Sequence, residues 1–233
     1  MDINRNSSWA KSAGGLDLEL YWSPSKKLTE LENSLLIIGG VHGDEPEGVF
    51  LAQKVLGYIP KLMTQDVSLG DWALIPCLNP DGFKDNQRVN ANGVDLNRNY
   101  PASNWSKDHD QLRYFPGLKP QSESEIRALV KLIKTIKPSL IIHCHSWKPC
   151  IVCSGEPGLE YAKLLGQSSG YEVINSIGYP TPGSLSQYGW TDFNIPVICI
   201  EEAEQPITDE IWNRFKAGFE NVFKLHASKA QSS

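Results

Sequence analysis

The sequence predicts a single α/β domain with a mixed, mostly parallel central sheet and helices on both faces. Short apolar runs alternate along the chain with segments of helical periodicity, as in proteins built from successive strands and helices. Most of these runs are apolar at every position, which is typical of strands that are buried on both faces. A chain of 233 residues lies within the size range of one large domain, so we expect one domain over residues 1–233.

Composition argues against several classes of protein. The formal net charge of −5 gives no reason to expect nucleic acid or an anionic membrane as a partner. The first residues lack the basic and apolar regions of a secretory signal, and no apolar run approaches the length of a membrane span, so a cytoplasmic location is expected. The cysteines are odd in number and mostly lie in apolar runs, which indicates reduced thiols rather than a disulfide framework.

The first part of the chain contains two predicted strands and one predicted helix. Residues 16–22 alternate apolar and polar side chains within a polar segment, which predicts an edge strand with one solvent-facing side. Leu35–Ile38 is an apolar run closed by two glycines and predicts a short buried strand. Pro46 suits the first turn of a helix, and apolar residues at helical spacing continue that helix until Gly57 ends it.

A long segment of low periodicity follows the next strand. That strand is predicted over residues 72–78 and runs into Asn79-Pro80-Asp81-Gly82, which has strong turn chemistry. Between residues 79 and 121, aromatic residues and arginines occur at intervals, unlike the low-complexity composition of a linker. Because a long loop in a compact domain usually has a function, we expect this one to contribute to a site.

The second half of the chain returns to alternating strands and helices. Ser122-x-x-Glu125 predicts a capping box at the start of a helix that ends near Lys137, before a proline. The further predicted elements are strands at 140–145 and 151–153, a helix at 159–166, an extended segment at 171–174, a strand at 196–200 and an amphipathic helix at 208–226.

Three predicted buried strands are followed by side chains that can bind a metal. In chain order these are His42 and Glu45, then His143 and His145, then Glu201 and Glu202. Ligands bind beyond the carboxyl ends of the strands in parallel sheets, so we expect these groups to build one site. Two ligands with a short spacer and a third about a hundred residues later predict a zinc site that keeps one position open for water. Taken alone, the H-x-x-E pattern is also compatible with a simple turn that contains a packed histidine.

Several motifs, in the right order, give the chain a family resemblance. They are His42-Gly43-Asp44-Glu45, Asn79-Pro80-Asp81-Gly82, Gly93-Val94-Asp95-Leu96-Asn97-Arg98-Asn99-Tyr100, a histidine closing a central strand and a glutamate closing a late one. Over about residues 35–205 the chain resembles the zinc carboxypeptidase family of the carboxypeptidase A type. Within that family, the short chain and the segment Tyr179-Pro180-Thr181-Pro182-Gly183-Ser184-Leu185 look most like the bacterial murein peptide amidases.

The resemblance implies a zinc-peptidase catalytic domain with one Zn²⁺ per chain. It implies that His42, Glu45 and a histidine of the 143–145 pair are the ligands. Both histidines point to the same side of a strand, and the register favours His145 as the ligand, with His143 behind it or in the core. Glu201 matches the general base of the family; Glu202 is the rival, since adjacent strand residues face opposite sides.

The resemblance also implies roles for residues of the long loop. Asp95 matches the acid that holds the far nitrogen of a zinc-ligand imidazole, although it could simply shape the turn after Gly93. Asn97 and Arg98 match the groups that bind the terminal carboxylate of the substrate, and Arg88 matches the group that faces the developing oxyanion. Exposed arginine is the alternative interpretation, above all for Arg88.

The implied activity is hydrolysis of the γ-D-glutamyl–meso-diaminopimelate amide bond of small murein peptides. Tyr179 matches the mobile tyrosine that hydrogen-bonds near the scissile amide, with Tyr188 as the alternative because prolines stiffen the loop around Tyr179. Two other functions remain open: a succinylglutamate desuccinylase or aspartoacylase-like zinc amidohydrolase, and a non-catalytic protein that binds peptidoglycan peptides. The oligomeric state, and whether the role is wall recycling or degradation of foreign wall, are left open by the sequence.

Overall fold

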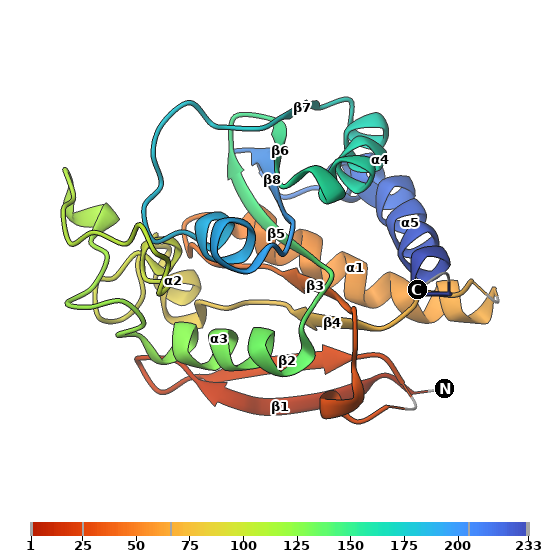
Figure 1. Ribbon diagram of the computed structural model, residues 1–233, viewed down its shortest axis with the longest axis horizontal. Coiled ribbons are helices and arrows are strands. Elements are labelled where there is room, and N and C mark those ends of the chain that lie inside the picture. Colours follow the sequence, from red (N-terminus) through yellow and green to blue (C-terminus); the bar gives the residue numbers. More distant parts are fainter. Residues whose placement is uncertain (1, 25, 66, 205, 232–233) are drawn as a thin grey trace.

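The computed structural model describes residues 2–24, 26–65, 67–204 and 206–231. Its strands form one mixed sheet in the order β1-β2-β4-β3-β5-β8-β6-β7 (Figure 1). The pairings β4–β3, β3–β5, β5–β8 and β6–β7 are parallel, and the others are antiparallel. The strands are β1 (Asn4–Lys11), β2 (Asp17–Trp22), β3 (Leu35–Ile38), β4 (Trp72–Ile75), β5 (Leu140–Trp147), β6 (Cys150–Ser154), β7 (Glu172–Ile174) and β8 (Val197–Ala203).

Helices cover both faces of this sheet, as predicted. The helices are α1 (Pro46–Thr64), α2 (Pro80–Asp85), α3 (Ser124–Ile136), α4 (Leu159–Ser169) and α5 (Asp209–Gln231). Apolar side chains of α1, α4 and α5 pack with alternate residues of the central strands on one face. The other alternate residues pack against α3, against Leu185 and against Tyr188. Tyr188 belongs to a π-helical segment over Gln187–Asp192, which Leu185 precedes. The prediction of a mixed, mostly parallel α/β sheet is therefore confirmed.

The prediction of an edge strand at residues 16–22 is wrong. The strand β2 lies between β4 and β1, and β1 is the edge strand that the sequence did not reveal. Most residues of β1 are exposed or half-buried polar side chains, so the segment has no apolar pattern. Leu18 and Leu20 of β2 are fully buried, and they belong to the same core cluster as the residues of α3.

The predicted end of the first helix at Gly57 is also wrong, because α1 continues through Gly57 and Pro60 to Thr64. Glycine costs about 1 kcal/mol in a helix interior and proline about 3 kcal/mol. Each apolar side chain that is fully buried contributes about 1.5–3 kcal/mol in return. Ile59 and Leu62 are completely buried in the core that α1 shares with α5, so packing keeps this last part of the helix folded.

The predicted capping box of α3 does not form. The residue before the helix is Glu123, which makes no capping hydrogen bond with its side chain. The Ser122 hydroxyl donates instead to the Glu123 carboxylate at 2.6 Å and accepts a hydrogen bond from Asn99 Nδ2 at 2.9 Å. Ser122 thus ties the long loop to the start of α3 rather than capping the helix.

The parallel central strands bring the predicted site residues to one edge of the sheet. In the sheet register, Ile38 of β3 lies opposite His143 of β5, and His145 of β5 lies opposite Glu201 of β8. The long loop around α2 gathers on the side of the molecule opposite both termini (Figure 1). Among the described helices, none combines the length and apolar character needed to cross a membrane.

Candidate active site

The loop after β3 holds His42 and Glu45 in a fixed conformation. A Cβ atom at Gly43 would lie 1.9 Å from the carbonyl carbon of Gly82, so only glycine permits this loop to pack against α2. Glu45 immediately precedes α1, and Pro46 occupies the first helical position. The Glu45 side chain makes no capping hydrogen bond to the helix, so its carboxylate remains available to the site.

The side chains of His42, Glu45 and His145 converge on one point. Nδ1 of His42 lies 2.8 Å from one Glu45 carboxylate oxygen, and Nδ1 of His145 lies 2.7 Å from the other. The two Nδ1 atoms are 3.0 Å apart. All three side chains are buried, and their ligand atoms form a group that could hold a metal ion. A cation between these four potential acceptor atoms would satisfy all of them, and two imidazoles with one carboxylate suit zinc.

The far nitrogen of each of these imidazoles has a partner of its own. His42 Nε2 lies 3.0 Å from Asp95 Oδ1, and His145 Nε2 lies 2.9 Å from His143 Nδ1. Such contacts fix the tautomer of a ligating histidine and leave its other nitrogen for the metal. Asp95 Oδ1 also accepts a hydrogen bond from the backbone N–H of Asn97 at 2.8 Å. Both interpretations of Asp95 therefore describe real contacts: it shapes the turn and holds His42.

Arg88 balances the negative charge of this group. Its Nε donates to Asp95 at 3.0 Å and its Nη1 to Glu45 at 3.1 Å. Burial would raise the pKa of Asp95, but His42 and Arg88 hold it well below its usual range. Burial would also raise the pKa of Glu45, but the neighbouring His42 and His145 rings hold it well below its usual range. Both carboxylates are thus kept ionised, as metal binding requires.

The adjacent residues Glu201 and Glu202 occupy opposite faces of β8. Glu201 lines the same cavity as the converging ligands, whereas the Glu202 carboxylate accepts hydrogen bonds from Tyr171 and Arg214 on the α4–α5 side. Burial, together with the charge of Glu45, raises the pKa of Glu201 although His145 opposes the shift. The Cys199 thiol donates to Glu201 at 3.2 Å. Glu201 is therefore the carboxylate that faces the candidate metal position.

Arginines surround one end of this cavity, which has a volume of about 380 Å³. The guanidinium groups of Arg88, Arg98 and Arg113 lie 5.2, 5.9 and 5.6 Å from the centre of the Tyr114 ring. Arg98 Nη1 also donates to the backbone carbonyl of Asn97 at 2.8 Å. The sequence did not single out Arg113, which has no distinguishing motif around it. A cluster of guanidinium groups favours a substrate with a negatively charged end.

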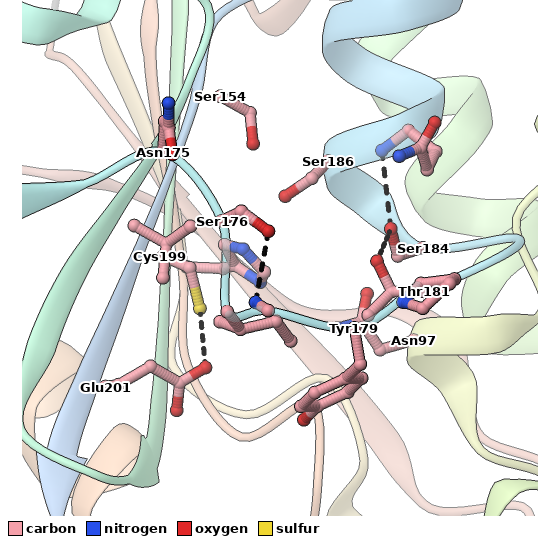
Figure 2. A pocket seen from close by; sticks show the side chains of 16 residues that line it. Asn97, Ser154, Asn175, Ser176, Tyr179, Thr181, Ser184, Ser186, Cys199 and Glu201 are labelled. Carbon is pink, nitrogen blue, oxygen red and sulfur yellow. Dashed lines mark hydrogen bonds between the residues drawn. The ribbon is translucent and has the colours of Figure 1, made fainter.

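A second cavity, of about 430 Å³, opens beside Glu201 (Figure 2). Neutral polar side chains from separate segments line it, including Ser154, Asn175 and Ser186. Glu201 is the only carboxyl group among its described lining residues, which include no lysine or arginine. This cavity and the arginine-lined one share Glu201, Tyr179 and other residues, so together they offer space for a charged group and for a neutral polar one.

Tyr179 and Tyr188 lie in different surroundings. Tyr179 is 51% exposed and lines both cavities, whereas Tyr188 is 1% exposed and stacks on Tyr100 with ring centres 5.8 Å apart. The segment after Tyr179 is joined to the Asn97 loop, because Asn97 Oδ1 accepts a hydrogen bond from Leu185 N at 3.0 Å. Of the two tyrosines, only Tyr179 is placed to meet a ligand.

Two asparagines that the sequence did not reveal fix the long loop. Asn99 Nδ2 donates to the carbonyls of Pro116 at 2.7 Å and Lys119 at 3.1 Å, and its Oδ1 accepts from Glu123 N at 3.1 Å. Asn90 Oδ1 accepts from Val94 N at 3.0 Å. A buried amide that satisfies backbone groups replaces regular structure in such a loop. The family motif contained Asn99 but gave it no role, and the density of asparagine in an aperiodic segment was the only sequence signal for Asn90.

Comparisons with known proteins agree with this geometry. The family model described as zinc carboxypeptidase matches residues 2–206. Murein peptide amidase A of Escherichia coli K12 is 33% identical over 227 residues, which cover 92% of this chain and 88% of that protein. The crystal structure of murein-tripeptide amidase from Escherichia coli O157 matches with a TM-score of 0.75 and 28% identity, over 96% of this chain and 93% of that one.

A more distant structure shares the fold alone. Carboxypeptidase A of Helicoverpa armigera matches with a TM-score of 0.76 at 16% identity, over 99% of this chain and 70% of that one. The converging His42, Glu45 and His145 side chains fit the zinc that gives the family its name. The family model and the curated amidase each cover most of the chain, and this protein therefore belongs to the zinc carboxypeptidase family and is a zinc-dependent peptide hydrolase.

Proposed function

We propose that this protein hydrolyses the amide bond between γ-D-glutamate and meso-diaminopimelate in murein peptides. The observation that carries the proposal is the pairing of an arginine-lined cavity with a neutral polar cavity on either side of Glu201. A meso-diaminopimelate leaving group has an α-carboxylate and a side chain that ends in both an amine and a carboxylate. The arginines suit the first carboxylate, and a neutral polar pocket suits a side-chain end without net charge. The likeness to a murein peptide amidase supports the same substrate class.

We assign the zinc ligands to His42, Glu45 and His145. When bound there, zinc polarises the scissile carbonyl and lowers the pKa of the attacking water. Asp95 and His143 hold the two imidazoles by their far nitrogens, at 3.0 and 2.9 Å. Their role is to keep each Nδ1 directed at the metal and unprotonated.

Glu201 is the proposed general base. It takes a proton from the attacking water as the new C–O bond forms. It then gives this proton to the leaving amine as the C–N bond breaks and the carbonyl is restored. Its position opposite His145 in the sheet register places it beside the ligand group, and its elevated pKa favours proton transfer near neutral pH. Glu202 is excluded from this role, since its carboxylate lies on the other face of β8.

Asn97, Arg98 and Arg88 are the proposed anion-binding groups. The Asn97 side-chain oxygen is engaged with Leu185 N, so its Nδ2 amide is the group that would donate to a substrate carboxylate. Arg98 lines the cationic cavity and offers a guanidinium fork to the same carboxylate. Arg88 holds Asp95 and Glu45 and stabilises the negative charge that develops on the carbonyl oxygen. Tyr179 would donate its hydroxyl hydrogen near the scissile amide.

The test compares matched substrates with the zinc-loaded protein. L-Ala-γ-D-Glu-meso-diaminopimelate is compared with the same tripeptide carrying L-lysine, which keeps the amine and lacks the distal carboxylate. We expect kcat/KM for the diaminopimelate peptide to be at least about 100-fold higher, because a site built for a polar group rejects a substrate that lacks it. Equal cleavage of both peptides, or preferential cleavage of ordinary C-terminal dipeptides, would refute this specificity.

N-acyl amino acids serve as a further arm of the same experiment. Preferential cleavage of N-succinyl or N-acetyl amino acids would favour the desuccinylase or aspartoacylase-like alternative. The cytoplasmic location stays a prediction, and fractionation of cells that produce the protein tests it.

A further inference from the structure

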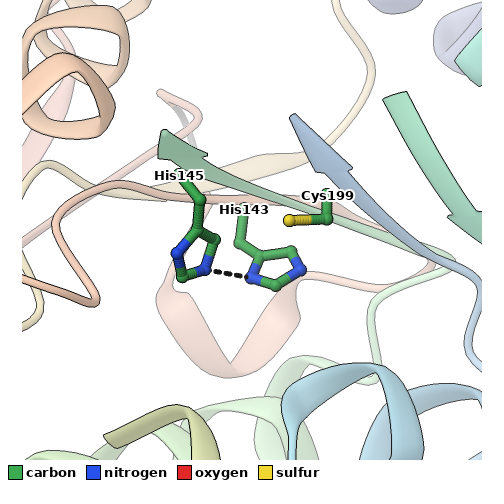
Figure 3. A group of neighbouring side chains, drawn as sticks. All are labelled: His143, His145 and Cys199. Carbon is green, nitrogen blue, oxygen red and sulfur yellow. Dashed lines mark hydrogen bonds between the residues drawn. The ribbon is translucent and has the colours of Figure 1, made fainter. Parts of the chain in front are cut away.

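A second group of potential metal ligands lies directly behind the first. His143 and His145 of β5 and Cys199 of β8 each offer a ligand atom, and these atoms all lie within 4.8 Å of one another (Figure 3). The three residues are 1%, 3% and 7% exposed. His143 and Cys199 are direct neighbours in the register of two parallel strands. The sheet itself, rather than a mobile loop, therefore sets the spacing of these ligands.

An unpartnered buried atom points to a missing ligand at this group. Nε2 of His143 is buried and has no hydrogen-bond partner in the part of the chain that the structure describes. A buried polar group without a partner costs about 1–3 kcal/mol. Cys199 is a free thiol whose sulfur lies beside the His143 ring (Figure 3). A cation bound through His143 Nε2 would give that nitrogen a partner, with the Cys199 sulfur as a second ligand.

His145 can serve both ligand groups because its two ring nitrogens face different ways. Its Nδ1 lies 2.7 Å from Glu45 and 3.0 Å from His42, in the group assigned to the zinc of the peptidase site. Its Nε2 lies 2.9 Å from His143, in the second group. One imidazole can thus stand between two ions, with the second ion on the side of β8.

We propose that His143, His145 and Cys199 form a second metal site that takes a thiophilic divalent ion of the zinc type. Two imidazoles and a thiolate are ligands that zinc accepts, and three protein ligands leave a fourth position open. His143 and Cys199 also line the cavity of about 430 Å³, which gives the ion a path of entry. On binding, the Cys199 thiol and His145 Nε2 each release a proton to solvent.

Occupation of this second site opposes hydrolysis, an inference that rests on the proposed function. The ion takes the thiol that donates to Glu201 at 3.2 Å and adds a positive charge beside the proposed base. It also withdraws His143 from its contact with His145. Contacts behind a zinc ligand are worth about 10- to 100-fold in activity or metal affinity, so we expect at least about tenfold inhibition by a second ion.

Metal stoichiometry tests the site independently of activity. The protein loaded with one zinc per chain is dialysed against Cd²⁺, and bound metal is counted while sulfur-to-cadmium charge-transfer absorption is recorded. We expect a second ion with that absorption in the natural protein. Cys199→Ser and Cys199→Val should keep the first ion, which shows that they fold, and lose both the second ion and the absorption. Cys153→Ser removes another buried thiol, on the neighbouring strand β6, and should keep both ions.

The outcomes separate this inference from the proposed function. A protein that cleaves the murein peptide but binds one ion only, or keeps its second ion in Cys199→Val, overturns the second site alone. A protein that binds two ions with the sulfur absorption but cleaves no murein peptide supports the second site and overturns the proposed function. If the second ion binds through Cys199 and the murein-peptide activity is unchanged, the inhibitory role is wrong.

Discussion

Glu201 and Glu202 are adjacent, chemically identical and largely buried, yet their carboxylates have opposite surroundings. The Glu202 carboxylate accepts hydrogen bonds from Arg214 at 2.7 Å and from Tyr171, between β8 and the helices α4 and α5. Glu201 faces the cavity, where, within the described part of the chain, the weak thiol of Cys199 is the one group that donates a hydrogen bond to it. The comparison shows that one face of the strand surrounds its acid with strong hydrogen-bond donors, whereas the other face leaves its acid beside the cavity, where we propose that it is the general base.

The same division applies to the two sides of the sheet. The face covered by α1, α4 and α5 is a continuous apolar core from β4 to β6. On the other face, in the C-terminal halves of β5 and β8 and in the loop after β3, histidines and carboxylates take the place of apolar residues. A buried acid with only a weak hydrogen-bond donor costs stability, which supports the proposal that Glu201 takes part in the reaction.

The largest effect is expected from Glu201→Gln. Loss of the proposed base should lower kcat about 10²- to 10⁴-fold, while zinc stoichiometry remains at the natural value because no ligand is removed. The metal-free variant should be at least as stable as the metal-free natural protein, since an uncharged amide is easier to bury. Peptide hydrolysis, metal analysis and urea unfolding measure these three quantities. Activity close to that of the natural protein would assign the base elsewhere.

Asp95→Asn should weaken zinc binding about 10- to 100-fold, because an amide cannot support the His42 imidazole as a carboxylate does. Competition with a chromogenic chelator measures the affinity. Asp44→Asn is the matched control: Asp44 lies next to the ligands, but its carboxylate accepts from Arg113 at 3.3 Å rather than contacting an imidazole. If both variants bind zinc equally well, Asp95 does not support the metal site.

Glu202→Gln is expected to have the opposite effects from Glu201→Gln, because Glu202 contributes to stability and not to the proposed reaction. It should retain kcat and lower the free energy of unfolding by about 1–3 kcal/mol, since Arg214 and Tyr171 lose a charged acceptor. Arg214 is partly exposed, which keeps the cost below that of a fully buried pair. Urea unfolding of the metal-free protein measures the loss. A large fall in kcat with unchanged stability would reverse the roles given to the two acids.

The smallest effect concerns His226, which lies far from the cavities and is 2% exposed. Its Nε2 donates to the Asp71 carbonyl at 2.9 Å, but burial lowers its pKa below the usual value. As the pH falls, the unfolded chain therefore binds a proton at this histidine before the folded protein does. The contribution of His226 to the free energy of unfolding is complete above about pH 6.5 and decreases at lower pH.

The change should amount to about 1.4 kcal/mol for each unit by which the pKa is lowered. His226→Gln keeps a donor for Asp71 and should remove this part of the pH dependence, measured by urea unfolding of both metal-free proteins. Identical slopes for the two proteins between about pH 7 and pH 5 would show that His226 does not contribute.

The sequence by itself determined the fold class, the family and the strand ends that carry the chemistry. Apolar runs at 35–38, 140–142 and 196–200 could be recognised locally, because strands buried on both faces are mostly apolar. The motifs around His42 and Asp95 are contiguous and could be read directly. The edge strand β1 could not be predicted, since its polar residues pair through the backbone and leave no side-chain pattern.

Only the tertiary structure decided which residues far apart in the chain lie next to each other in the core and at the candidate site. The continuation of α1 past Gly57 could not be predicted from the sequence. The side chains that Ile59 and Leu62 pack against include those of α5, at the other end of the chain. Nor could the sequence distinguish Glu201 from Glu202 by residue type. Strand register placed Glu201 opposite His145 and Cys199 opposite His143. The pairing of strands that are far apart in the sequence brings these residues together, so a local sequence pattern cannot predict their contacts.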